Sequence, residues 1–246
     1  MQNYCYDLHI HSCLSPCAED DMTPANIAGM GSLCGLTLMA LTDHNTTGNL
    51  PAFFDACKVH GIVPVGGMEL TTSEEIHIIC LFDTLKAAMD FGEEVYAHLP
   101  PMKNKPEIFG NQLYMDSQDN ILRTEEKLLL MASDLSLDEA EELVGKYGGI
   151  CYPAHIDRES NGILAILGTI PPESEFTCFE LNDRNNLDGC AEKCPLITGM
   201  EMLTCSDAHR LWEINEAEHT VALDDEPYSS QRVREALLEH LRGNKA

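Results

Sequence analysis

Imidazole and carboxylate side chains recur in short motifs along this chain, and their spacing favours metal chemistry. His9 and His11 lie two residues apart in DLHIHS, so they share one face of an extended strand. Later motifs contribute further potential ligands: His44 in LTDHN, Glu69 in GGMEL, His77 in EEIHIICLF, His155 in YPAHID, and Asp207 with His209 in CSDAH. Such ligands suit Zn, Mn and Fe, and the set is too large for one ion.

The elements that must position these residues alternate between strand-like and helix-like segments. The apolar pattern predicts strands over residues 4–10, 36–42, 62–65, 76–82, 149–153, 177–181, 200–205 and 219–223. It predicts helices over residues 24–33, 51–60 and 162–167, and a last helix after Ser229 and Ser230. This alternation is typical of a parallel sheet or barrel with helices outside.

Nearly every predicted strand carries an imidazole or a carboxylate at or beside its carboxyl end. In parallel α/β barrels, functional sites are built at that end. A single histidine in an apolar strand is more often a core residue with a hydrogen-bond partner. Four clusters at four strand ends are improbable as coincident buried polar groups, because each would need its own partners. The joint pattern therefore indicates a site.

One stretch, residues 84–147, departs from the alternation. It reads as a helix, a turn at Pro100 and Pro101, an irregular segment and two further helices. Ser136 and Glu139 form a capping box at the start of the second of these helices. We interpret the stretch as a mainly helical insertion. Because it lies between two potential ligands in the sequence, we expect it to act as a cap that limits substrate size.

The charge of the chain is strongly negative, with 15 Lys and Arg against 41 Asp and Glu and a net charge of −26. This balance argues against a protein that follows nucleic-acid backbones or docks on anionic membranes. An acidic chain that binds an anionic substrate needs cations, which bound metals would supply. The sequence has neither a membrane-spanning apolar run nor signal-peptide features, and its 11 cysteines read as reduced thiols. We therefore expect a cytoplasmic protein.

In this order, DLHIHS, LTDHN, GGMEL, EEIHIICLF, PAHID and CSDAH together resemble the PHP (polymerase and histidinol phosphatase) domain superfamily. The resemblance extends from Asp7 to about His209, apart from residues 84–147. It implies one domain over residues 1–246, an α/β fold built as a distorted seven-stranded (β/α) barrel with that insertion. It also implies a metal site at the carboxyl face of the barrel and metal-dependent hydrolysis of phosphoesters.

The resemblance implies two to three divalent transition-metal ions, Zn, Mn or Fe, held by three groups of residues. The first group is His9, His11, Glu69 and Asp207; the second is Glu69, His77 and His155, with Glu69 as the bridge; the third contains His44 and His209.

The third ion needs one more ligand from the loop after DLHIHS. The offset from the histidine pair reaches Pro16 or Cys17, whereas counting back from Pro24 reaches Glu19. We favour Glu19, with Asp20 as the second choice. A Cys17 thiolate would favour zinc in this site.

Paired divalent ions about 3.5–4 Å apart clamp a phosphoryl group and lower the pKa of a bound water. A metal-bound hydroxide would then attack the phosphorus, so no catalytic serine or cysteine is needed. Arginine is the natural partner for the remaining phosphate oxygens. Arg158 follows His155 by three residues and Arg184 follows the strand 177–181, so we expect both to contact substrate.

We therefore expect a hydrolase that acts on a small phosphate ester: a phosphomonoester, a nucleotide or a short oligonucleotide. On the charge of the chain we expect no long nucleic acid and no membrane among its partners. Two alternatives remain: a nuclease of the polymerase-associated PHP type acting on DNA, and a metal-binding domain without turnover. The sequence leaves the exact substrate, the native metal and the oligomeric state open.

Overall fold

The structure is a computed structural model that describes residues 1–243 of the chain. Its strands are β1 (Gln2–Asp7), β2 (Leu38–Leu41), β3 (Val63–Thr71), β4 (His77–Phe82), β5 (Leu113–Met115), β6 (Ile121–Thr124), β7 (Ile150–Pro153), β8 (Cys178–Glu180), β9 (Glu201–Leu203) and β10 (Thr220–Leu223). Its α-helices are α1 (Pro24–Leu33), α2 (Leu50–His60), α3 (Leu85–Ala97), α4 (Pro106–Phe109), α5 (Leu137–Lys146), α6 (Ile163–Ile166), α7 (Leu187–Lys193) and α8 (Ser230–Leu241). Three short 3₁₀ helices are η1 (Arg184–Asn186), η2 (Pro195–Gly199) and η3 (Leu211–Glu213).

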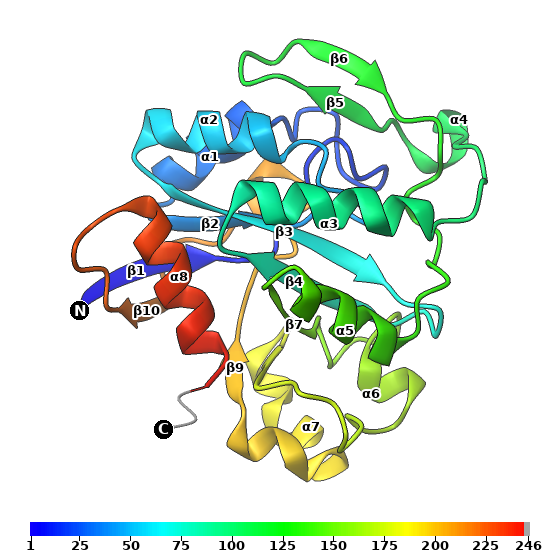
Figure 1. Ribbon diagram of the computed structural model, residues 1–246, viewed down its shortest axis with the longest axis vertical. Helices are drawn as coiled ribbons and strands as arrows, with labels where there is room; N and C mark the ends of the chain where they lie inside the picture. Colours follow the sequence, from blue (N-terminus) through cyan, green and yellow to red (C-terminus); the bar gives the residue numbers. More distant parts are fainter. Residues whose placement is uncertain (244–246) are drawn as a thin grey trace.

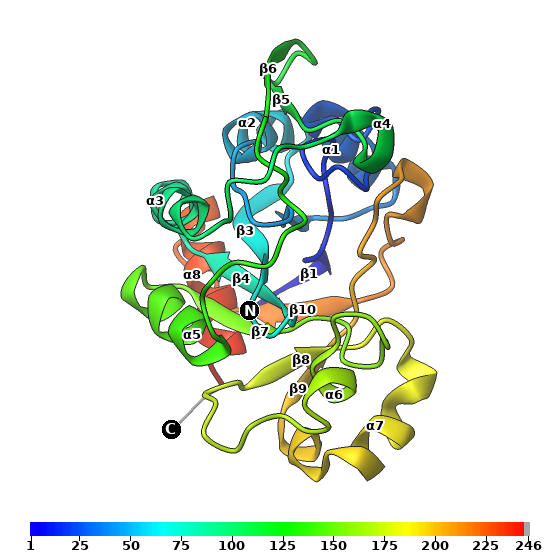
Figure 2. The same ribbon diagram turned by 90° about the vertical axis from the view of Figure 1, so that its right-hand side faces the viewer.

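The centre of the fold is a curled, mixed six-stranded sheet with the order β10-β1-β2-β3-β4-β7 (Figures 1 and 2). Strands β1, β2 and β3 are parallel, whereas β4 is antiparallel to both of its neighbours and β10 is antiparallel to β1. Strands β8 and β9 form a separate parallel pair. The expected α/β class is confirmed, whereas the six-stranded sheet and the separate pair of the described residues do not confirm the expected seven-stranded barrel.

Local sequence explains where the helices begin and end. The hydroxyl of Thr23 accepts the Asn26 N–H at 3.2 Å and Pro24 is the first residue of α1. Helix α2 ends at Gly61, which has a φ of 70° that other residues adopt at a cost. The expected capping box of Ser136 and Glu139 is present at the start of α5. Short local signals of this kind, which need no long-range partner, were therefore readable from sequence.

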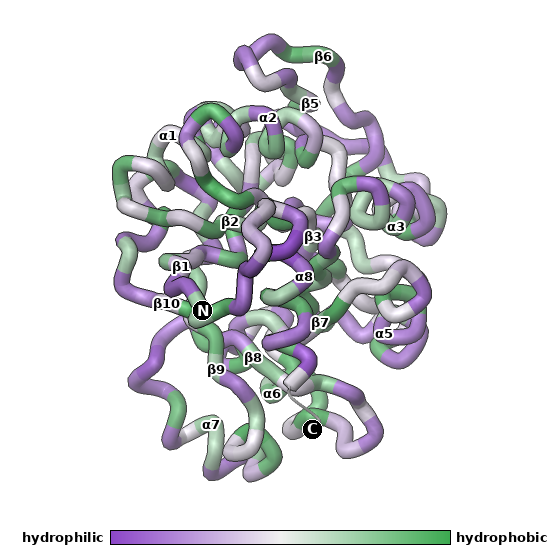
Figure 3. The backbone as a smooth tube through the Cα atoms, turned by 60° about the vertical axis from the view of Figure 1, so that its left-hand side comes forward, coloured by the Kyte–Doolittle hydropathy of each residue, from purple (hydrophilic) through white to green (hydrophobic). Residues whose placement is uncertain are grey.

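The packing around the sheet follows the hydropathy of the chain. All nine residues of β3 and all four of β2 are buried, as expected for strands covered on both faces. In Figure 3 the chain around β2, whose sequence is LMAL, is coloured as hydrophobic, while the outer loops carry much of the hydrophilic sequence. Of the described helices, none is both long enough and apolar enough to cross a membrane.

The stretch 84–147 contains three helices and one hairpin rather than helices alone. Helix α3 packs on the sheet, and the approach is so close that a Cβ at Gly66 would lie 2.9 Å from the Ala88 Cβ. The β5–β6 hairpin projects from the top of the molecule in Figure 1. It is attached by the Asn49 side chain, which accepts the Met115 N–H at 2.9 Å and donates to the Leu113 carbonyl at 3.0 Å. The irregular part of this stretch thus adjoins the loop after β2.

Candidate metal centre

The potential ligands meet at one edge of the sheet. His9 and His11 follow β1, His44 follows β2, Glu69 lies near the end of β3 and His155 follows β7. His77 is the first residue of β4 and so lies at the amino end of its strand. Because β4 is antiparallel to β3, its amino end pairs with the carboxyl end of β3, and His77 lies opposite Thr71. The reversal brings this histidine to the same edge.

Four buried side chains form the first cluster: His9, His11, Glu69 and Asp207. The two Nε2 atoms of His9 and His11 are 3.1 Å apart, and each is 3.1 Å from Asp207 Oδ1. Glu69 Oε2 is 3.5 Å from His9 Nε2 and 3.2 Å from His11 Nε2. Ligand atoms bonded to one ion at about 2.0–2.1 Å are separated from each other by roughly 3.0–3.4 Å. The spacing of this cluster therefore fits a single transition-metal ion.

Glu69 connects the first cluster to a second one, formed by His44, Glu69 and His77. Its Oε2 atom lies 2.9 Å from His44 Nδ1, and its Oε1 atom lies 2.7 Å from His77 Nδ1. His155 Nε2 is 3.1 Å from the same Oε1. The two oxygens of one buried carboxylate thus point at different sets of imidazoles, which is the arrangement that a bridging ligand requires.

The third cluster consists of His11, His44 and His209. The His11 ring lies 4.3 Å from the His209 ring and 4.4 Å from the His44 ring, measured between centroids. Glu19 is not part of the three clusters. Its carboxylate accepts the Arg210 Nε–H at 2.9 Å, and it is partly exposed.

The two alternatives to Glu19 differ in position. Asp20 accepts the side-chain amide of Asn111 at 2.8 Å on the exposed surface. Part of the Cys17 side chain is exposed to solvent, but the surrounding protein, and next the negative charge of Glu69, raise the pKa of its thiol. A positive ion beside this thiol would act in the opposite direction on its pKa.

The chemistry of the donor set fits bound cations. Among residues 1–243, four buried atoms of the three groups have no hydrogen-bond partner: His44 Nδ1, Glu69 Oε2, His155 Nδ1 and Asp207 Oδ1. Unpartnered buried polar atoms are rare, and an ion or a water is the usual partner that completes them. Carboxylate oxygens and imidazole nitrogens that converge without a hydrogen bond between them are suited to metal coordination.

The pKa values of the histidines reflect their burial and the negative charge of the nearby carboxylates. Burial lowers the pKa of His11, but the nearby carboxylates of Asp207 and Glu69 outweigh it and raise the pKa to about 9. Burial lowers the pKa of His44 to about 3 and that of His209 to about 4, so both rings are neutral. The carboxylates of the centre thus attract positive charge, and two of its imidazoles offer free lone pairs.

Two residues of the centre have strained backbones. His155 has a φ of 27° and Asp207 a φ of 50°, values that residues with a side chain rarely adopt. Such strain costs on the order of 1–3 kcal/mol per residue and persists where the surroundings fix the conformation. His155 lies in the loop after β7 and Asp207 in the loop after β9, and their side chains lie 3.1 Å from Glu69 and His9, respectively. The backbone is therefore bent to bring these side chains together.

The sequence analysis missed the residue that holds the His9 ring, Glu180. Its oxygens lie 2.9 and 3.1 Å from His9 Nδ1, and both side chains are buried. A signal was available, because Glu180 is the one acidic residue in the apolar strand segment TCFEL. A buried carboxylate in such a segment needs a partner.

Asp43 also reaches the ligands, through a serine rather than directly. Ser15 donates to Asp43 Oδ1 at 2.7 Å and lies 3.0 Å from His11 Nδ1. Ser12 donates to the other carboxylate oxygen at 2.6 Å. Asp43 therefore fixes the loop after β1, and through it the orientation of the His11 ring.

The two arginines singled out from sequence have different surroundings. Arg158 donates to Asp207 Oδ2 at 2.5 Å and to Asn182 Oδ1 at 2.8 Å, so its guanidinium adjoins the first cluster. Arg184 lies exposed on η1, where its charge acts on Tyr6 and His219. In the described part of the chain it makes no ion pair or hydrogen bond with the clusters.

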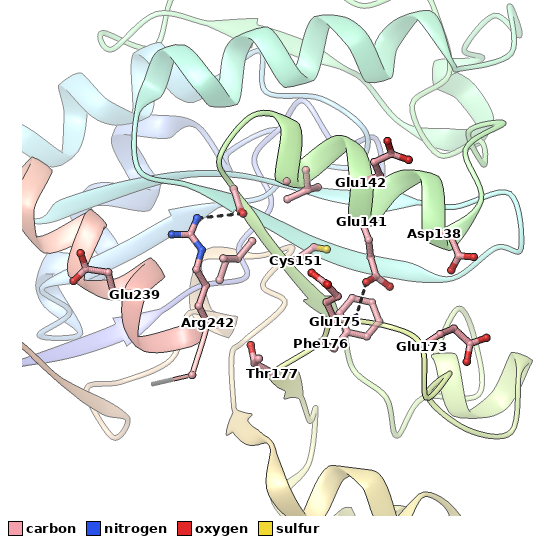
Figure 4. A pocket seen from close by; sticks show the side chains of 15 residues that line it. Asp138, Glu141, Glu142, Cys151, Glu173, Glu175, Phe176, Thr177, Glu239 and Arg242 are labelled. Carbon is pink, nitrogen blue, oxygen red and sulfur yellow. Dashed lines mark hydrogen bonds between the residues drawn. The ribbon is translucent and has the colours of Figure 1, made fainter. Parts of the chain in front are cut away.

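A cavity with a volume of about 1040 Å³ lies at the opposite edge of the sheet (Figure 4). It opens between α5 and the end of α8, beside the amino end of β7. Its wall contains six acidic residues: Asp138, Glu141, Glu142, Glu173, Glu175 and Glu239. Arg242 also lines it and donates to the carbonyl of Gly148 at 2.7 Å. None of the clusters of potential metal ligands lies there.

Known structures share this fold. A lesion-specific endonuclease from Pyrococcus furiosus matches with a TM-score of 0.69 at 18% identity, over 100% of this chain and 57% of the endonuclease. A complex of endonuclease Q with a 27-mer duplex substrate carrying an abasic lesion matches with a TM-score of 0.65 at 17% identity, over 100% of this chain and 58% of that one. An amidohydrolase from Chromobacterium violaceum, with bound sulfate and no metal, matches with a TM-score of 0.57 at 20% identity, over 94% and 96% of the two chains.

These relatives correct one expectation. We expected no long nucleic acid among the partners, on the ground of the net charge. The complex of endonuclease Q contradicts this, because a protein with a similar fold over 58% of its length was solved with a 27-mer duplex substrate. The physical reason is that net charge describes the whole chain, whereas bound cations determine the field at a site. This chain spans somewhat more than half the length of those endonucleases.

Comparison with known protein families identifies the family of the chain. No curated protein matches it. The PHP domain matches residues 7–145, which is more than half of the chain and includes DLHIHS, LTDHN, GGMEL and EEIHIICLF. The match rests on motifs that the fold brings to one edge of the sheet. The chain therefore belongs to the PHP domain family.

Proposed function

We propose that this protein is a metal-dependent hydrolase of phosphoester bonds and that its active centre is the set of three clusters. The observation that carries the proposal is the first cluster, whose ligand atoms lie 3.1–3.5 Å apart in the five distances given above. A structural network of hydrogen bonds would not leave buried oxygens of Glu69 and Asp207 without a partner.

The proposed ligands divide by position. His9, His11, Glu69 and Asp207 would hold one ion, and Glu69 with His77 and His155 a second. His44 and His209 would hold a third, with His11 beside them. When bound, such ions supply Lewis acidity and lower the pKa of a coordinated water. Cys17 replaces Glu19 as our candidate for the remaining ligand, because Glu19 is paired with Arg210.

Arg158 would bind the phosphate. A guanidinium has five N–H donors, and Arg158 uses two of them on Asp207 and Asn182. The others can donate to phosphate oxygens while the contact with Asp207 holds the guanidinium beside the metal centre. The same contact would orient the Asp207 carboxylate, whose other oxygen lies in the first cluster. The proposed phosphate contact therefore rests on Arg158 rather than on Arg184.

The bond that is cleaved is a phosphoester, and two substrate classes fit it. The first is the small phosphate ester expected from sequence. The second is a phosphodiester within a DNA strand, favoured by the likeness to a lesion-specific endonuclease. A cap over the centre would distinguish the two substrate classes by size. The segment between α3 and α5 is our candidate for this cap, because it contacts the loops after β1 and β2. The Leu113 N–H donates to the Cys13 carbonyl at 2.9 Å, and the Asn45 side chain donates to the Leu129 carbonyl at 2.7 Å.

The test is hydrolysis of three substrates by the same preparation, with and without added Mn²⁺ or Zn²⁺. The substrates are p-nitrophenyl phosphate, bis-(p-nitrophenyl) phosphate and a labelled duplex with one abasic site. We expect metal-dependent turnover of at least one, abolished in Glu69→Gln. Cleavage of the duplex without turnover of the monoester would identify the nuclease. Metal-loaded protein that turns over none of the three would contradict the proposal and favour a binding domain.

A further inference from the structure

We infer that Glu180 is a positioning residue that presents the Nε2 atom of His9, rather than Nδ1, to the metal. This inference rests on the proposed metal centre and concerns a residue outside its ligand clusters. Glu180 Oε1 and Oε2 lie 2.9 and 3.1 Å from His9 Nδ1. The exposed fraction of both side chains is at most 1%, so water does not compete for this contact.

The chemistry of the pair determines which nitrogen carries the hydrogen. A carboxylate that is removed from water must receive hydrogen bonds, and the Nδ1–H of His9 is the side-chain donor aimed at both Glu180 oxygens. With Nδ1 as the donor, Nε2 carries the free lone pair. That lone pair faces Asp207 Oδ1 and His11 Nε2, both at 3.1 Å. A carboxylate on the far side of a ligating imidazole also makes the ring a stronger base toward the metal.

Glu180 holds a second proposed ligand through the backbone. The His155 N–H donates to Glu180 Oε1 at 3.3 Å, and the Ile156 N–H donates to the Glu180 carbonyl at 2.9 Å. These contacts fix His155 in its strained conformation, with a φ of 27°. One side chain on β8 therefore orients the ring that follows β1 and the backbone that follows β7.

Glu180 is not itself a ligand in this arrangement. Both of its oxygens face Nδ1, whereas the metal-facing atom Nε2 lies on the other side of the imidazole ring, and Glu180 belongs to none of the three clusters. A purely structural ion pair would also account for its burial. The two interpretations differ in one respect: only a positioning residue changes how tightly His9 holds a metal.

The test compares metal binding by Glu180→Gln and by a matched control, Glu125→Gln. Glu125 is also a buried carboxylate, with 8% of its surface exposed, but it accepts the hydroxyls of Tyr96 and Tyr114 at 2.9 Å in the segment between α3 and α5. Mn²⁺ affinity is measured by equilibrium dialysis without substrate. For one ion in Glu180→Gln we expect a dissociation constant about 10–100-fold larger than that of wild type. In the control the dissociation constant should be unchanged. An affinity within twofold of wild type would overturn the inference.

A second measurement is made on the wild-type protein and needs a variant only to assign the His9 resonances. In the ¹⁵N spectrum of the Zn²⁺-loaded protein, the resonances of His9 are assigned from their loss in His9→Gln. We expect a protonated Nδ1 and a metal-bound Nε2; a metal-bound Nδ1 would overturn the inference. Failure of wild type to bind Mn²⁺ or Zn²⁺ would overturn the metal centre as well. Normal binding by both wild type and Glu180→Gln would overturn the role of Glu180 alone.

Discussion

Two regions of this molecule are rich in carboxylates, and they lie at opposite edges of the same sheet. At the metal edge, Glu69 and Asp207 are buried and converge on histidines within 3.5 Å. At the other edge, six acidic residues surround a wider cavity, and those labelled in Figure 4 are spread around its rim. The number of acids is larger where no cluster of potential ligands forms.

The comparison shows that convergence and burial, rather than the number of acids, distinguish a metal centre. At the acidic cavity the Glu141 carboxylate accepts the Glu175 N–H at 2.9 Å, and burial raises its pKa. The carboxylates of the centre respond in the opposite direction. Burial alone would raise the pKa of Glu69, but His77, His9 and His44 lower it well below its usual value. A buried carboxylate surrounded by imidazoles stays ionised, so it can bind a cation.

The largest effect should come from Glu69→Gln, which removes the carboxylate shared by the first and second clusters. We expect the loss of more than one bound ion per chain by elemental analysis. We expect activity to fall on the order of a thousandfold, or about 4 kcal/mol in activation free energy. Glu142→Gln, at the rim of the acidic cavity, is the matched control. Full metal content in Glu69→Gln would show that Glu69 is not the bridge.

Arg158→Lys should have the next largest effect. Lysine retains the positive charge beside Asp207 but cannot donate to Asp207, Asn182 and a phosphate in one plane. Charge-assisted hydrogen bonds contribute roughly 1.5–3 kcal/mol, so kcat/KM should fall about tenfold to a hundredfold. Arg232→Lys, on the exposed face of α8 with Glu239 as partner, should change nothing. Equal kinetics of the two variants would mean that another group binds the phosphate.

Cys17→Ser tests the remaining ligand of the third cluster and should have a smaller effect. A serine hydroxyl is a poor replacement for a thiolate on zinc. We expect one ion per chain to dissociate more readily, while the ions at Glu69 stay bound. Glu19→Gln serves as the comparison, since its carboxylate is paired with Arg210. If Glu19→Gln loses the third ion and Cys17→Ser keeps it, then Glu19 is the remaining ligand, as expected from the sequence.

The smallest effect should come from the acidic cavity itself. Glu142→Gln and Glu173→Gln change exposed carboxylates in its wall. Surface substitutions of this kind usually change the free energy of unfolding by no more than about 0.5 kcal/mol. We expect thermal unfolding and metal content to match those of wild type. A loss of bound metal in either variant would remove the distinction between the two edges.

The sequence allowed the prediction of features that depend on local pattern. Buried strands such as β2 and β3 followed from apolar runs, and the helix starts at Thr23 and Ser136 from capping residues. The reversal of β4 was not predictable, because an apolar strand reads the same in either direction and its orientation depends on which neighbour it pairs with.

In the candidate site, the residue types were readable but the partners were not. Glu19 has the right chemistry for a ligand, yet Arg210, from a segment distant in the sequence, pairs with it. In the sequence Glu180 is an acidic residue within a strand, and only the fold shows that it contacts His9. Which charged groups meet depends on the packing of whole elements, and no spacing rule within one motif contains that information.

The proposed ligands also come from opposite ends of the chain, and this has a consequence for folding. His9 and His11 precede α1, whereas Asp207 and His209 follow β9. A cation held by both pairs closes a loop of nearly the whole chain, as a crosslink would, and long loops gain the most from closure. Strands β2, β3, β8 and β9 all lie inside that loop, but β8 and β9 form a separate pair outside the six-stranded sheet. Chelation should therefore speed amide hydrogen exchange in β8 and β9 more than in β2 and β3.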